Sequence, residues 1–175
     1  MIKNMIAKQL DKQEQDFGVS LDYVRHILNT SLPAFFKFGM FMPLAQHRRS
    51  LPPEAFAVAR IVATRDEDCG TCVQLEVNQA QKTGTASAIL QAILNDTPDD
   101  LPLELATVYH FTQAVIGQTG TEDQYRTDIV SQWGEEALVE LALAIASARA
   151  FPIIKRSLGY ATRCSLVEIQ VKDAA

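Results

Sequence analysis

Apolar residues recur along most of this chain with the spacing that places them on one face of an α-helix, as Ala86, Ile89, Leu90 and Ile93 illustrate. Alternation of apolar and polar residues, which is typical of a strand, occurs only in the short tail 165–171. With proline and glycine residues marking helix ends, the pattern predicts helices at about 2–16, 20–29, 32–46, 53–65, 69–82, 85–95, 101–117, 122–132 and 135–158. We therefore expect an all-α bundle of about seven to nine helices with no substantial sheet.

The last predicted helix, 135–158, is the longest and has few polar residues. Glu136, Glu140 and Ser147 share one narrow face of it, and most other positions up to residue 150 are apolar or small. A helix of this composition is expected to be surrounded by other helices or by a second subunit. The chain is therefore expected to form a homo-oligomer, a dimer, trimer or larger assembly.

The longest apolar stretch, 137–154, falls within this helix. Glu140 and Arg149 interrupt it, so it is shorter than the ~20 clean apolar residues that a membrane span requires. Pro152 has no amide N–H and is expected to kink or break the helix. Lys155 follows it, where a positive charge complements the carboxyl end of the helix dipole.

Composition narrows the class of protein. The chain has 175 residues, which is enough for one domain. Hydrophobic residues make up 47% of the chain and charged residues 21%, so a disordered chain is excluded. The net charge is -5 and the basic residues are scattered, which argues against a nucleic-acid surface. Residues 1–18 lack the apolar run of an export signal. We expect a cytoplasmic protein with no membrane or nucleic-acid partner.

Two of the three cysteines form a Cys-x-x-Cys pair, Cys69 and Cys72, directly after the acidic residues 66–68. With Asp68 as the N-cap, both sulfurs would lie in the first turn of the helix, and Glu76 would lie one turn beyond Cys72. Amide groups and the positive dipole end of a helix stabilise a thiolate, and the spacing permits a reversible disulfide. Thiol redox chemistry is thus the first hypothesis for this pair.

Two alternatives stay open. Free cysteines are often small buried hydrophobes, so the pair could simply pack in the core. A structural zinc site needs four ligands, and the remaining candidates form no second paired motif: His26, His47, His110 and Cys164. Neither a metal nor a cofactor is therefore expected, and Cys164 is interpreted as structural.

Residues 68–76, with the sequence DCGTCVQLE, resemble the Cys-x-x-Cys helix of the carboxymuconolactone decarboxylase and AhpD-like alkylhydroperoxidase superfamily. Residues 133–146 and 151–159 resemble the long C-terminal helix of that superfamily, so the resemblance covers about 50–160 and leaves 1–48 as additional N-terminal helices. It implies an all-α oligomer in one AhpD-like domain. It also implies a dithiol that cycles with a disulfide, reduces a peroxide or disulfide substrate and is restored by a thiol reductant.

By that resemblance, Cys72 is the attacking thiol and Cys69 resolves. The family's relay histidine, four residues after the second cysteine, is replaced here by Glu76, and its upstream glutamate by Ala57. A carboxylate with an ordinary pKa of about 4.3 is a weaker base than an imidazole at about 6.5, so Glu76 would need a buried setting to act as the base. The alternative for Glu76 is a solvated or salt-bridged helix residue.

Other residues could contribute to a proton relay. Glu54 lies one turn before Ala57, and His110 lies off the main apolar stripe of its own helix, where packing is its alternative role. Arg60 could supply a cation to the same site. The aromatic and methionine residues of 32–46 are interpreted as core or subunit interface rather than as the lining of a pocket.

Two other functions also fit the sequence. The departures from the relay favour a redox-inactive helical oligomer that serves in binding or assembly. A cofactor-free enzyme of the decarboxylase type would instead use Glu76 as an acid and base, with Cys69 and Cys72 only lining the pocket.

Overall fold

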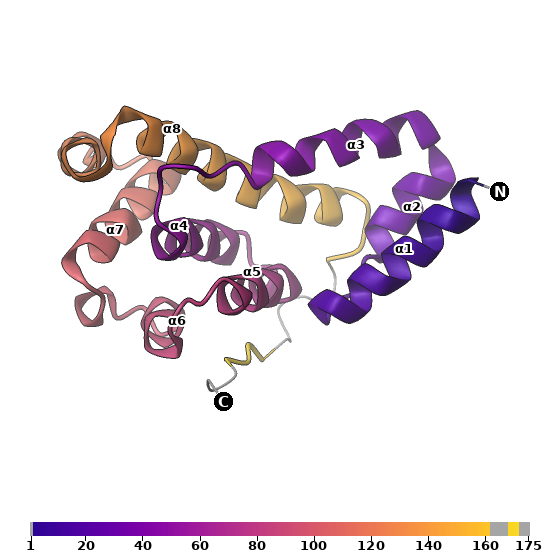
Figure 1. The fold of residues 1–175 in the computed structure, drawn as a ribbon, viewed down its shortest axis with the longest axis horizontal. Coiled ribbons are helices and arrows are strands. Elements are labelled where there is room, and N and C mark those ends of the chain that lie inside the picture. Colours follow the sequence, from indigo (N-terminus) through magenta and orange to yellow (C-terminus); the bar gives the residue numbers. More distant parts are fainter. Residues whose placement is uncertain (1, 162–167, 172–175) are drawn as a thin grey trace.

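A computed structural model describes residues 2–161 and 168–171. All regular secondary structure in the described residues is helical: it consists of eight α-helices and one short 3-10 helix, with no strand (Figure 1). The elements are α1 (Ile2–Phe17), α2 (Asp22–Thr30), α3 (Leu32–Ala45), α4 (Pro53–Asp66), α5 (Gly70–Lys82), α6 (Ser87–Leu94), η1 (Pro98–Asp100), α7 (Leu103–Gly117) and α8 (Glu122–Ser157). The all-α prediction is confirmed, and the predicted helix bounds agree with these closely.

Helix α4 lies at the centre of the main core and packs against α5, α7 and α8 (Figure 1). Its sequence alternates small with branched apolar side chains, as at Ala57, Val58, Ala59 and Ile61, all of which are buried. Small side chains let neighbouring helices approach closely on several sides, so this helix has no wide solvent face. The central position of α4 brings its polar residues into the interior, where they need partners.

Helix α8 contains a sharp change of direction at Gly134, whose φ of 83° and ψ of 172° are not helical. Only glycine adopts this region readily, which explains why the sequence pattern separated 122–132 from 135–158 at this point. Pro152 was expected to kink or break the helix, and a break is wrong, because α8 continues through Pro152 to Ser157. Pro152 is buried, and its packing there offsets the loss of one helical hydrogen bond.

The polar face of α8 points inward, and other helices of this chain cover only part of α8, so a second subunit around it stays a prediction. Glu140 and Ser147 are both fully buried, whereas Val139 is 56% exposed and Ile153 is 47% exposed. Glu140 accepts hydrogen bonds from the backbone N–H groups of residues 49–51. The buried carboxylate thus holds the loop before α4, and part of the apolar face stays uncovered within one chain.

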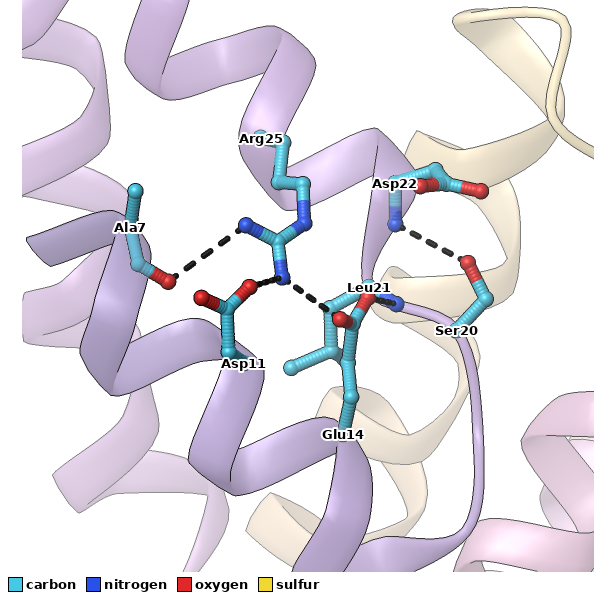
Figure 2. A network of polar contacts seen from close by, with 7 residues as sticks. All are labelled: Ala7, Asp11, Glu14, Ser20, Leu21, Asp22 and Arg25. Carbon is cyan, nitrogen blue, oxygen red and sulfur yellow. Dashed lines mark hydrogen bonds and ion pairs between the residues drawn. The ribbon is translucent and has the colours of Figure 1, made fainter. Parts of the chain in front are cut away.

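Helices α1 to α3 form a second apolar cluster that packs against the end of α8 and beside α5 (Figure 1). Arg25 on α2 links this layer: its guanidinium donates to Asp11 at 2.7 Å, to Glu14 and to the carbonyl of Ala7, all on α1 (Figure 2). The second carboxylate oxygen of Glu14 accepts from the N–H of Leu21 at 2.7 Å. These contacts fix α1 on α2 and so shape the cavity described below.

Among the described helices, only α8 is long and apolar enough to cross a membrane by length and composition. Of its most apolar window, 44% is buried inside the protein. A core helix passes the same test, so this feature is only weak evidence for a membrane span.

Candidate functional site

The two cysteines lie where α5 begins. Their sulfur atoms are at disulfide distance and their Cα atoms are 5.3 Å apart. Cys69 itself is the N-cap residue, and the helix starts at Gly70, which corrects the expectation that Asp68 caps it. Asp68 has a φ of 48°, in the left-handed region, whereas an N-cap residue normally has extended backbone. Cys72 therefore lies in the first turn, and Cys69 stands just before it.

The two sulfurs differ in their surroundings. Cys69 is 1% exposed, whereas Cys72 is partly exposed and lines a cavity. An incoming substrate or thiol therefore reaches Cys72 more readily on this side of the helix.

The acidic run before the pair is largely neutralised. Glu67 is buried and forms ion pairs with Arg149 at 2.7 Å and with Arg156 at 3.2 Å. Arg149 also pairs with Asp66 at 3.2 Å, and Asp68 is exposed to solvent. The run therefore opposes a nearby thiolate less than the sequence alone suggests.

Glu76 lies one turn after Cys72 and faces the same cavity, as the spacing predicts. Both of its oxygens are engaged by Arg60, whose Nε donates at 2.7 Å and whose terminal nitrogen donates at 2.6 Å. Arg60 also donates at 2.9 Å to the carbonyl of Ala45 and at 2.9 Å to Ser147 Oγ. Only a few per cent of either charged side chain is exposed. The geometry thus favours the salt-bridged alternative for Glu76 over a free base.

A second cation, Lys155, contacts Cys69 indirectly through the Thr71 hydroxyl. The ammonium of Lys155, near the end of α8, donates to Thr71 Oγ1. The same hydroxyl lies 3.8 Å from Cys69 Sγ, within hydrogen-bond distance for sulfur. Thr71 Oγ1 thus contacts both the Lys155 ammonium and the Cys69 sulfur. From the sequence, Lys155 was assigned only a role at the helix end, because its partner lies 84 residues away in the chain.

The cavity beside Cys72 has a volume of about 440 Å³ and lies between the N-terminal layer and the core. Aromatic rings form much of its wall: Phe38 lies edge-on to Tyr23 and to Phe151, with centroid distances of 6.1 and 5.9 Å. Burial raises the pKa of Tyr23 to about 12, and the charge of Glu76 acts in the same direction. Its phenol is therefore protonated at neutral pH.

The aromatic residues of α3 have two roles. Phe35 and Phe38 pack against the N-terminal apolar cluster, as the core interpretation expects. Phe35, Phe36, Phe38 and Met42 also line this cavity, which the sequence pattern did not indicate. The apolar density of a segment does not reveal whether its side chains meet each other or enclose a space. That α3 lines the cavity follows only from the way in which α3 packs against α8.

The remaining predicted residues are not at this cavity. Glu54 lies in the first turn of α4, and His110 on α7 stacks on Tyr125 with an interplanar angle of 23° and meets Tyr109 edge-on. Neither side chain lines the cavity. Cys164 lies outside the described residues. In the described ranges, no three residues among His, Cys, Asp and Glu are grouped as a metal would require.

No family model, no curated protein and no solved structure matches this chain. The case for its function therefore depends on the residues and their geometry.

Proposed function

We propose that this protein is an AhpD-like thiol-disulfide oxidoreductase with peroxidase activity, in which Cys72 is the nucleophile and Cys69 resolves. The observation that carries the proposal is a Cys-x-x-Cys pair at disulfide distance, with Cys72 open to a cavity and Cys69 buried. Reversible disulfide formation at this spacing is the chemistry that such a pair performs.

The proposed oxidation has two steps. The Cys72 thiolate attacks the terminal oxygen of a hydroperoxide, the O–O bond breaks, and the alkoxide leaves and takes a proton to become an alcohol. Cys72 is then a sulfenic acid. The Cys69 thiolate attacks the Cys72 sulfur, an S–S bond forms, and hydroxide leaves as water. One peroxide is reduced by two electrons while the dithiol becomes a disulfide.

Reduction needs a dithiol partner. Its first thiolate attacks Cys72, which is the accessible sulfur, and Cys69 leaves as a thiolate. The Thr71 hydroxyl, fixed by Lys155, is placed to donate a hydrogen bond to this leaving sulfur. The partner's second thiol then displaces Cys72, so the partner leaves as a disulfide and the protein dithiol is restored. A cytoplasmic setting belongs to the proposal because thiol reductants are abundant there.

A homo-oligomer is also part of the proposal. It is supported by the uncovered apolar face of α8, where Val139 and Ile153 are about half exposed. A contiguous apolar patch on this face would be typical of a surface that a second subunit covers. Light scattering of the purified chain measures the mass directly.

The decisive experiment compares three single variants of the full chain in a dithiothreitol-dependent assay of cumene hydroperoxide reduction. Cys72→Ser is expected to abolish turnover. Cys69→Ser is expected to form no internal disulfide, so that without dithiothreitol one peroxide oxidises Cys72 to a sulfenic acid that can be trapped. Cys164→Ser is the matched control and should keep the wild-type rate. An unchanged rate in Cys72→Ser would refute the proposal and favour the redox-inactive alternative.

A further inference from the structure

The cavity beside Cys72 is large enough for a ligand and has a mainly apolar wall. Its volume of about 440 Å³ falls in the range of roughly 300–1,000 Å³ that is usual for small-molecule sites. Apolar side chains from α1, α2, α3, α5 and α8 enclose it: Ile6, Leu10, Val24, Phe35, Leu75 and Phe151. Such a lining fits a hydrocarbon chain rather than a polar metabolite.

Three charged side chains line this cavity, namely Arg60, Glu76 and Lys155. Arg60 and Glu76 pair with each other through two hydrogen bonds, so their charges cancel. In the part of the chain that the structure describes, no carboxylate lies within 4.0 Å of the Lys155 ammonium. The cavity wall therefore has one net positive charge.

Lys155 is only 8% exposed, so its charge is poorly solvated by water. Among the described residues, its hydrogen-bond partner is the neutral Thr71 hydroxyl, and an ammonium has three N–H donors. The carboxyl end of α8 supplies partial negative charge but no full counter-ion. A buried cation in this setting is complemented by a single anionic group placed in the cavity.

Part of the cavity lining on α3 is exposed to solvent. Phe36 and Met42 line the cavity and are also exposed, and so is Gly39 between them. Around Gly39 the space is open, since a Cβ atom there would meet no heavy atom within 4 Å. A ligand can therefore enter past α3 without displacing the buried core.

We propose that this cavity binds a single-chain amphipathic acid, with its carboxylate on Lys155 and its hydrocarbon chain among the aromatic residues of α3 and Phe151. The apolar wall, the cancelled Arg60–Glu76 pair and the lone buried cation carry this inference together. It goes beyond the proposed redox function and does not depend on it, because neither sulfur has to react for the acid to bind.

The test measures binding of dodecanoate to the full chain by calorimetry, below the concentration at which the ligand forms micelles. Dodecanol is the neutral probe and dodecyltrimethylammonium is the cationic one. Dodecanoate should bind at least about tenfold more tightly than dodecanol, since a charge-assisted contact is gained, and the cation should bind worst. Shortening the acid by two methylenes should weaken binding by about tenfold.

Variants assign the contact to Lys155. Lys155→Met should weaken dodecanoate binding by at least about tenfold and leave dodecanol binding unchanged, which also shows that the variant is folded. Lys155→Arg should restore most of the affinity for the acid. Lys37→Met, which removes an exposed lysine of α3 outside the cavity lining, is the matched control and should bind as the wild type does.

Binding by the Cys69→Ser variant separates this inference from the redox proposal, because Cys69 is needed for the disulfide but does not line this cavity. Dodecanoate affinity in that variant should stay within a few-fold of the wild type, whether or not the wild type turns over peroxide. The inference is overturned if the wild type does not bind dodecanoate, if dodecanol binds equally well, or if Lys155→Met binds the acid as tightly as Lys37→Met does.

Discussion

The pair formed by Glu76 and Arg60 gives a prediction that separates two roles for Glu76. Both side chains are almost fully buried, and two hydrogen bonds of 2.6–2.7 Å join them. Glu76→Gln keeps the shape of the side chain but removes its charge, which leaves the Arg60 guanidinium buried without a counter-ion. Breaking a buried ion pair in this way costs about 3–5 kcal/mol. In a chain of this length that lowers the Tm by roughly 6–20 °C.

The double variant Arg60→Met/Glu76→Leu replaces the pair with apolar side chains of similar size, a change that is often nearly neutral. Arg60 also holds Ala45 and Ser147, so the exchange has a residual cost. Ser147 keeps a hydrogen bond to the carbonyl of Ala144, which leaves the Ala45 carbonyl as the main loss, about 1–3 kcal/mol. The double variant should therefore be more stable than Glu76→Gln alone.

Urea unfolding measures these stabilities, and peroxide reduction well below the Tm measures function in the same samples. If Glu76 is an ion-pair residue, the double variant recovers both stability and rate relative to Glu76→Gln. The ion-pair argument is refuted if Glu76→Gln unfolds within about 1 kcal/mol of the wild type yet loses turnover, and the double variant stays inactive. That result would restore the base role predicted from the sequence.

Two further predictions concern carboxylates that hold the scaffold. Burial opposes the ionisation of Glu140, but hydrogen bonds from the N–H groups of residues 49–51 outweigh it and lower the pKa of Glu140. Glu140→Ala should therefore leave these donors unpaired and lower the free energy of unfolding in urea by about 3–5 kcal/mol. A loss below about 1 kcal/mol would contradict this. Hydrogen bonding by Arg25 lowers the pKa of Glu14 from its ordinary 4.5, so its contribution to stability is full above that pH and is lost as the pH falls through the lowered folded value. The wild type should lose its stability advantage over Arg25→Met as the pH falls below 4.5, and a constant difference down to about pH 2 would show that the contact is not ionic.

The helices could be predicted because the information that specifies them is local. Apolar spacing of three and four residues and the glycine at position 134 are properties of short windows, and the structure follows them. The errors arose where packing overrides local preference. Pro152 stays inside a helix because it is buried there, and Glu140 points inward because its partners lie about 90 residues earlier in the chain. No window of sequence contains both ends of that contact.

The candidate site also has features that the local sequence predicts and features that it does not. The spacing of Cys69 and Cys72 guarantees that the sulfurs can meet, so the pair could be found from the sequence. The partner of Glu76 lies on another helix, and the hydroxyl that Lys155 contacts lies 84 residues before it. The sequence suggested Arg60 as a cation for this site but did not identify Glu76 as its partner. A side chain's neighbours across the core depend on the tertiary arrangement, which single-sequence patterns do not encode.

The cavity is formed by two parts of the chain, the segment that contains the cysteines and the helices that precede it. The cysteine pair and Lys155 lie in the segment 50–160, where the resemblance to the AhpD-like superfamily applies. Much of the aromatic wall comes from α1 to α3, which precede that segment. The thiol chemistry is thus proposed for the family-like core, which also supplies Lys155, while much of the apolar wall that a ligand meets beside Cys72 comes from helices outside it. A relative with the same cysteines and a different N-terminal layer would present the same sulfur to a different ligand.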